Sequence, residues 1–161
     1  MTAVTRVALA LLATAQLVIG GWNQFWPESF YAHFPTVHLD PPYSEHYARD
    51  FGGATLGLAV VLIAAFLVQR APLVITAGVA YSVFALPHFV FHATHLDHAT
   101  TGEATFLIVA NGVVALLGLL VVALGVLRMG RDRHVRDPAV DGPRRGGDRQ
   151  PAGRGVRGPV P

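Results

Sequence analysis

Long hydrophobic runs separated by short polar stretches dominate the chain from its N-terminus to about residue 128. A membrane-spanning helix needs about 20 mostly apolar residues, and four of the runs reach this length. Backbone in lipid must satisfy its own hydrogen bonds, so each run is expected to form a helix. With their polar ends, the predicted helices cover about residues 5–22, 45–69, 72–96 and 104–128. The pattern therefore predicts an all-α fold, a bundle of four transmembrane helices.

The placement of arginine predicts the orientation of this bundle, because basic residues concentrate on the cytoplasmic side of membrane proteins. Arg6 lies near the N-terminus, Arg70 lies between the second and third helices, and a cluster of arginines begins at Arg128. The other two connections share only Arg49. We therefore expect both termini of this multi-pass membrane protein to be cytoplasmic.

The segments outside the helices have two different compositions. Residues 23–43 hold four prolines and many aromatic side chains, which predicts an ordered lid over the extracytoplasmic end of the bundle. Residues 129–161 are rich in arginine, glycine and proline, a composition typical of disorder. Their arginines are expected to attract membrane lipid of negative charge, and nothing in them indicates specific nucleic-acid binding. The chain thus divides into a transmembrane domain, 1–128, and a disordered cytoplasmic tail.

Composition narrows the chemistry that the protein can perform. Hydrophobic residues make up 52% of the chain and charged residues only 14%, with a mean hydropathy of +0.45. Cysteine is absent, which excludes disulfides, iron–sulfur clusters and thiol catalysis. Most of the eight histidines lie in the stretches that are expected to face outward, and the first and fourth helices contain none.

The stretch HFVFHATHLDH gathers four of these histidines at the end of the third predicted helix. At 100° per residue, His88, His92 and His95 fall on one narrow stripe of the helix. His98 drifts away from this stripe. Pro87 lies inside the same helix and removes one backbone hydrogen bond at the start of the cluster. A proline beside polar side chains at membrane depth indicates backbone that faces protein rather than lipid.

A second polar stretch, SEHYARD, opens the second predicted helix. Glu45 and Arg49 are four residues apart, as are His46 and Asp50, so both pairs can be ordinary helix-surface pairs worth about 0.2–0.5 kcal/mol each. At 1.5 Å per residue, this stretch and the histidines of the third helix reach the same depth near the outer interface. Ionisable groups close to a bilayer are costly and usually functional, so a polar site shared by the two helices is the second interpretation.

An i, i+4 histidine pair on one helical face provides half of the ligands that zinc, copper or iron needs. The candidate ligands of such a metal ion, or of a haem, are His88, His92, His95 and His46. A carboxylate of Glu45, Asp50 or Glu103 could complete the set. Two alternatives stay open: an interfacial cap whose histidines bond to carboxylates and water, and a proton-linked or small-ligand site.

The fourth predicted helix carries two further polar signals. Thr100 and Glu103 have the spacing of a capping box, which would begin this helix. Asn111 lies inside the apolar run and is expected to form a hydrogen bond to a neighbouring helix.

Glycines predict where helices approach each other closely. Gly118 and Gly125 repeat a spacing of seven and form a packing seam along the fourth helix. The pattern Gly53-x-x-x-Gly57 predicts a second close approach on the second helix. Such seams serve packing within one chain as well as contacts between subunits, either in a homo-oligomer or with a partner membrane subunit.

The motifs resemble those of the DoxX-like group of small four-helix bacterial membrane proteins, over about residues 5–128. The similar positions are Trp22 or Trp26, Pro27, Phe30, Tyr31, Phe34 and Pro35; Glu45, His46, Arg49, Asp50, Phe51 and Gly52; and His88, His92 and His95. The resemblance implies the four-helix fold and a link to redox chemistry, since some DoxX relatives are linked to quinone-coupled sulfur oxidation.

Two functional hypotheses follow from the sequence. The first is a metal- or haem-binding, redox-linked membrane component with its site on the extracytoplasmic side. The second is a non-catalytic membrane subunit that binds a partner protein or lipid. The metal content of the purified protein distinguishes them.

Overall fold

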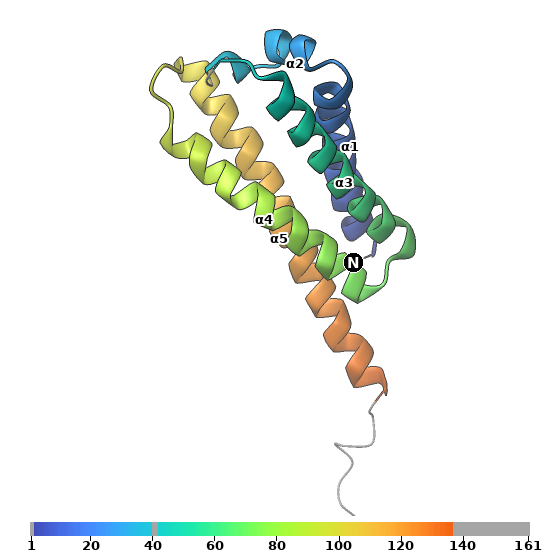
Figure 1. Cartoon of the computed structure of the whole chain (residues 1–161). Coiled ribbons are helices and arrows are strands. Elements are labelled where there is room, and N and C mark those ends of the chain that lie inside the picture. The colour runs from blue at the N-terminus through green and yellow to red at the C-terminus, as the bar shows by residue number, and fades with distance from the viewer. Residues whose placement is uncertain (1, 40–41, 137–161) are drawn as a thin grey trace, which may run out of the picture.

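The described residues, 2–39 and 42–136 of a computed structural model, form helices joined by short connections. The long helices are α1 (Thr2–Phe25), α3 (Glu45–Val68), α4 (Ala71–Thr94) and α5 (Thr101–Arg136), which run up and down the molecule (Figure 1). The connection from α1 to α3 contains α2 (Pro27–His33) and the short 3-10 helix η1 (Val37–Leu39). Four helices are long and apolar enough to cross a membrane. The predicted all-α, four-transmembrane-helix architecture is confirmed.

The long helices form two pairs. α1 packs along α3, and α4 packs along α5, whereas the pairs contact each other less. Figure 1 shows that the pairs meet near the α3–α4 turn and separate toward the end that carries α2. The largest fully buried side chains are Leu9, Leu12, Leu62, Val74, Tyr81 and Val121. The separation of the pairs leaves space under α2 and η1.

Glycines bring α4 and α5 into close contact. A Cβ atom at Gly118 would lie 2.9 Å from Tyr81 Cδ1, and one at Gly125 would lie 2.7 Å from Ile75 Cγ1. Real Cβ atoms essentially never approach this closely, so a larger residue at either position would force the neighbouring α4 side chain to move. The predicted seam of Gly118 and Gly125 therefore packs α5 against α4 inside the chain.

A different glycine pair brings α1 and α3 together. A Cβ at Gly52 would lie 2.6 Å from the backbone nitrogen of Gln24, and one at Gly20 would lie 3.1 Å from the Gly52 carbonyl oxygen. The predicted close approach at Gly53 and Gly57 is wrong at its second member, where a Cβ would meet nothing within 4 Å. One residue turns a helix by about 100°, so the glycine next to the predicted one faces α1 instead.

The turn between α3 and α4 satisfies its own backbone. Gln69 adopts a left-handed conformation, with φ of 54°, and its N–H donates to the Ala65 carbonyl. Its side-chain Nε2 also donates to the carbonyls of Ala65 and Phe66, at 3.1 and 3.0 Å. The last carbonyls of a helix have no partner within the helix, so this side chain ends α3 without leaving them unbonded.

Two predicted helix ends are corrected. α4 ends at Thr94 rather than at 96, whereas α5 continues past Arg128 to Arg136. The first residues of the predicted disordered tail are therefore helical, and the remainder, 137–161, lies outside the described residues. A helix that is already formed extends at little cost, and no proline occurs in this stretch before Pro138.

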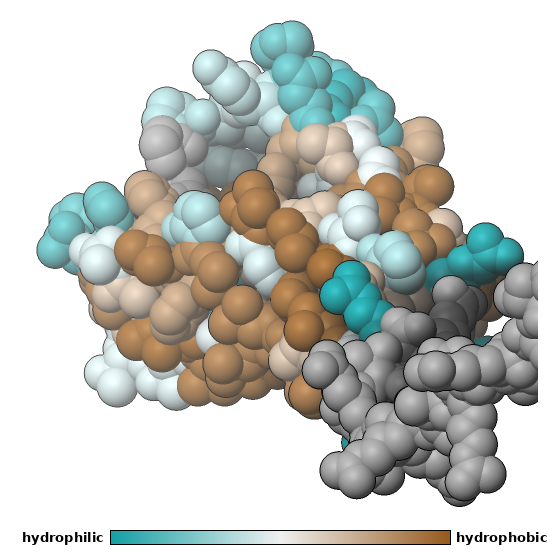
Figure 2. Space-filling model, turned by 90° about the horizontal axis from the view of Figure 1, so that it is seen from below, coloured by the Kyte–Doolittle hydropathy of each residue, from teal (hydrophilic) through white to brown (hydrophobic). Residues whose placement is uncertain are grey.

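Large hydrophobic side chains cover the outside of the bundle as well as its interior. Val7, Leu11, Val60, Val83 and Leu116 are each more than half exposed. Figure 2 shows hydrophobic residues gathered in a broad area across the middle of one face, with hydrophilic residues above it and at both sides. Such an extended apolar surface is costly in water and favourable in lipid, as expected of a membrane protein.

Candidate functional site

Two of the α4 histidines lie against each other. The ring centroids of His88 and His92 are 4.5 Å apart, and the Phe84 ring stacks on His88 at 5.2 Å. His95 does not continue this arrangement. His95 is the C-cap residue of α4. The centroid of its ring lies 4.3 Å from that of Phe91, on which it stacks, and its Nδ1 lies 3.0 Å from the Phe91 carbonyl oxygen. The predicted stripe of three histidines is broken because the helix ends before its third member.

The polar stretch at the start of α3 forms pairs on the helix surface. Arg49 Nε donates to Glu45 Oε1 at 2.8 Å, and His46 Nε2 lies 3.3 Å from Asp50 Oδ2. Arg49 also donates to the backbone carbonyl of Gln24, which ties the start of α3 to the end of α1. The His46 side chain is 83% exposed. These observations match the interpretation of ordinary helix-surface pairing.

The polar ends of α3 and α4 do not form one site. They lie at the same end of the bundle, but the two helices separate there (Figure 1). The predicted ligands His88, His92, His95 and His46 are consequently not assembled. Within residues 2–39 and 42–136, no group of three or more histidines, aspartates or glutamates is placed to hold a metal ion. A metal ion or haem at this end of the bundle stays a prediction from the sequence. Of its predicted histidine ligands, His88 and His92 contact each other.

The predicted capping box at the start of α5 is confirmed. The Thr100 N–H donates to Glu103 Oε2 at 2.8 Å, and the Glu103 N–H donates to Thr100 Oγ1 at 3.4 Å. The other carboxylate oxygen of Glu103 lies 3.1 Å from His38 Nε2 in η1. This contact joins the α1–α3 connection to the opposite helix pair, so the connection crosses the end of the bundle as a lid.

Aromatic rings order the rest of this lid. The Trp22 ring of α1 meets the Phe30 ring edge-on, with ring centroids 5.5 Å apart. The Phe30 ring stacks on the Phe34 ring, with centroids 4.6 Å apart. Tyr31 and Tyr43 bring their ring centroids to 5.4 Å. Desolvation, followed by the nearby Glu45 carboxylate, raises the pKa of the Tyr43 phenol above its ordinary value.

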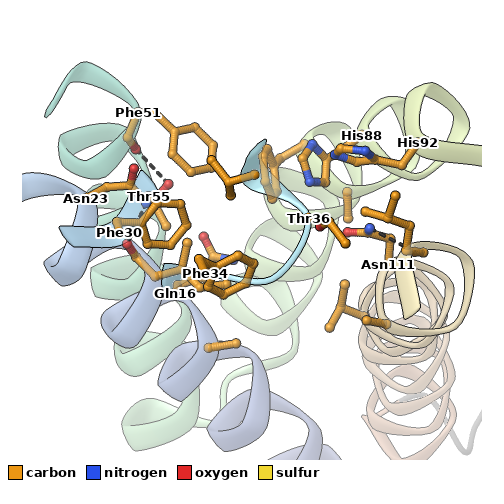
Figure 3. A pocket seen from close by; sticks show the side chains of 18 of the residues that line it. Gln16, Asn23, Phe30, Phe34, Thr36, Phe51, Thr55, His88, His92 and Asn111 are labelled. Carbon is orange, nitrogen blue, oxygen red and sulfur yellow. Dashed lines mark hydrogen bonds between the residues drawn. The ribbon is translucent and has the colours of Figure 1, made fainter. Parts of the chain in front are cut away.

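A cavity of about 410 Å³ lies between the two helix pairs and under the lid. Its walls come from all four long helices, α2, and the α2–η1 segment. Most of the lining is apolar, and much of it is aromatic: Phe30, Phe34, Tyr47, Phe51, Tyr81, Phe84 and Phe106. His88 and His92 also line it, whereas Glu45, His46, Arg49 and Asp50 do not. Figure 3 shows the two histidines on one side of the cavity and Phe51 and Phe30 on the other.

Three side-chain amides add polarity to this lining. They belong to Gln16 and Asn23 of α1 and to Asn111 of α5. The interhelical hydrogen bond predicted for Asn111 is wrong, because its Nδ2 donates to the Leu107 carbonyl of its own helix at 2.9 Å. Asn23 Nδ2 likewise donates to the Ile19 carbonyl at 3.0 Å.

Sequence reasoning missed most of this cavity. It selected charged and histidine side chains, whereas the cavity is lined mainly by neutral ones. A usable signal was present in α1, where Gln16 and Asn23 are seven residues apart and so share one face of an otherwise apolar helix. Polar residues at such positions in a membrane helix face protein or a cavity more readily than lipid.

The arrangement can enclose a small molecule beside a histidine pair. A volume of 410 Å³ lies within the range of about 300–1,000 Å³ that is usual for small-molecule sites. No protein-family model, curated protein or solved structure matches the chain.

Proposed function

We propose that this membrane protein binds a small, mainly apolar molecule in the cavity between its two helix pairs. The single observation that carries the proposal is the cavity itself, about 410 Å³ in volume with largely aromatic walls. Protein interiors are packed about as densely as organic crystals and leave few voids larger than a water molecule. A space of this size inside a membrane bundle is therefore expected to hold a ligand.

The position of the cavity also favours a ligand from the membrane. The cavity reaches from Gln16, well inside α1, to the lid formed by α2 and η1. A molecule dissolved in the outer part of the bilayer would find an apolar environment there, with aromatic rings that contribute about 0.5–1.5 kcal/mol per favourable ring contact. Binding of this kind is nearest to the second hypothesis from the sequence, a non-catalytic membrane subunit that binds a partner protein or lipid.

Membership of the DoxX-like group belongs to the same proposal. It rests on the motifs quoted above, several of which contribute to the cavity or its lid, such as Phe30, Phe34 and His88. A redox cofactor is not required for ligand binding. The bacterial plasma membrane is the proposed location.

The test is binding of naphthalene, a purely apolar aromatic probe, to the full-length protein in lipid nanodiscs. Equilibrium dialysis, with protein-free nanodiscs as the background, should reveal one saturable site. Ala110→Phe, which places a ring at the wall of the cavity, should weaken this binding by at least about tenfold, a loss of about 1.4 kcal/mol.

Ala123→Phe provides the matched control. Ala123 belongs to the same helix but is exposed and does not line the cavity. This variant should bind naphthalene as the wild type does. Equal binding by all three proteins, or binding that never saturates, would contradict the proposal.

A further inference from the structure

The amides that line the cavity have their nitrogen atoms occupied. Asn23 Nδ2 and Asn111 Nδ2 each donate to a backbone carbonyl of their own helix. A carbonyl oxygen can only accept a hydrogen bond, so the amide nitrogen must be the bonded end and the amide oxygen the other end. No hydrogen bond to either amide oxygen occurs within the described part of the chain. Both asparagines thus offer acceptors to the cavity.

Gln16 offers the most deeply buried acceptor. Its side-chain Oε1 has no hydrogen-bond partner among the residues that the structure describes. The residue is only 3% exposed, so water at the protein surface does not satisfy this oxygen. A buried polar atom without a partner costs about 1–3 kcal/mol. A ligand that donates a hydrogen bond to Gln16 Oε1 would remove this cost.

The lack of acidic and arginine side chains in the described lining bears on the charge of the ligand. No aspartate, glutamate or arginine is found among the described residues that line the cavity. An ion in an apolar cavity without an opposite charge is strongly unfavourable. With the imidazoles of His88 and His92 uncharged, the ligand that complements this lining is neutral, and it has at least one hydrogen-bond donor.

We propose that the ligand is a neutral aromatic molecule with a hydroxyl or N–H group, which donates to Gln16 Oε1 while its ring lies among Phe30, Phe51 and Phe84. Figure 3 shows Gln16 on the same side of the cavity as Phe30 and Phe51. This inference rests on the proposed function, because it identifies the chemical class of the molecule bound in the same cavity. Aromatic walls favour a flat ring over an acyl chain, since rings pack on each other edge-on or offset.

The experiment compares three probes of nearly equal size in the full-length protein in nanodiscs. Naphthalene has no polar group, 2-naphthol can donate a hydrogen bond, and 2-methoxynaphthalene has the oxygen but no donor. At neutral pH, 2-naphthol should bind about tenfold more tightly than 2-methoxynaphthalene after correction for partition into empty nanodiscs. This factor corresponds to about 1.4 kcal/mol, the strength of one good hydrogen bond.

Gln16→Leu should bring the affinities of 2-naphthol and 2-methoxynaphthalene close to each other while naphthalene still binds. Gln24→Leu is the matched control, because it makes the same chemical change in α1 at a residue that does not line the cavity. It should retain the preference. If Gln16→Leu does not fold, as judged by circular dichroism, Gln16→Met keeps the unbranched shape of the side chain and should give the same result.

The outcomes separate the two proposals. If none of the probes binds at a saturable site, the proposed function fails and this inference fails with it. If naphthalene binds and the wild type shows no preference for 2-naphthol, the cavity binds ligands, but the proposal that the ligand donates a hydrogen bond is wrong. The behaviour of the variants does not change this conclusion. If the preference persists in the Gln16 variants, Gln16 is not the acceptor.

Discussion

At the scale of single residues, glycines decide how closely α4 and α5 approach. A Cβ added at Gly78 would lie 2.8 Å from Val122 Cγ2 and 2.9 Å from the Val122 backbone nitrogen. Because backbone cannot move aside as a side-chain end can, Gly78→Ala should lower the free energy of unfolding by about 1–3 kcal/mol. Titration with a denaturing detergent, followed by circular dichroism, measures this change.

Gly57→Ala is the control for this prediction. A Cβ at Gly57 would meet no atom within 4 Å, and alanine is favoured over glycine inside a helix by about 0.5–1 kcal/mol. The variant should be as stable as the wild type or slightly more stable. A similar loss of stability in both variants would show that helix packing at Gly78 is not the cause.

Residue-scale prediction from the sequence succeeded where the partner lay within one helix turn. The pairs Glu45–Arg49 and His46–Asp50, and the capping box of Thr100 and Glu103, depend only on local spacing. Which helix end stands opposite another depends on how the bundle packs, and local spacing carries no information about that. For this reason the sequence could not show that the polar ends of α3 and α4 do not form the shared site that it suggested.

At the scale of an element, the capping box fixes the start of α5. Thr100→Ala removes the hydroxyl that accepts from the Glu103 N–H and donates to Glu103 Oε2. Loss of an N-cap side chain costs about 0.5–2 kcal/mol, so the amides in the first turn of α5 should exchange with solvent several-fold faster. Hydrogen–deuterium exchange with mass spectrometry, on the protein in detergent, measures the change.

Thr101→Ala is the comparison for this element. Thr101 follows Thr100 and is exposed. Thr101→Ala is therefore the same threonine-to-alanine change one residue later, and it leaves the capping box intact. Its exchange should match that of the wild type. Equal acceleration in both variants would mean that the hydroxyl of Thr100 does not stabilise the helix start.

The bodies of the long helices were predictable because hydrophobic runs of membrane length have few other structures available. Their ends were less so. α5 passes from apolar to charged residues at Arg128 without ending, because the helix, once formed, needs no apolar face to continue as far as Arg136. Hydropathy reports the part of a helix that lies in lipid, and a helix can be longer than that part.

At the scale of the whole molecule, the cavity depends on how the two helix pairs diverge. A helix that contacts both lipid and other helices is apolar on nearly all sides, so its sequence does not reveal which face meets which neighbour. The pairs are held together at one end by packing between Leu12, Leu62 and Val74, all of which are fully buried. At the other end the lid joins them through His38 and Glu103, with the cavity beneath.

The distribution of arginine over this shape predicts how the molecule lies in the membrane. The N-terminus, the α3–α4 turn and the C-terminal part of α5 lie away from the lid (Figure 1), and they carry Arg6, Arg70 and Arg128. Arg49 is at the lid end. α5 has 36 residues and is about 54 Å long, so it extends beyond a hydrocarbon core of about 30 Å. Its charged last turns therefore project into water on the arginine-rich side.

That side should face the cytoplasm, because basic segments are retained there. Green fluorescent protein fused after Arg136 should fluoresce, and alkaline phosphatase at the same point should be inactive. Inserted after Asp97, in the α4–α5 connection, the two reporters should give the opposite result. If the reporters at both points are reversed, the lid and cavity open toward the cytoplasm. Their ligand would then come from the inner leaflet, since the cavity reaches only the lid end of the bundle.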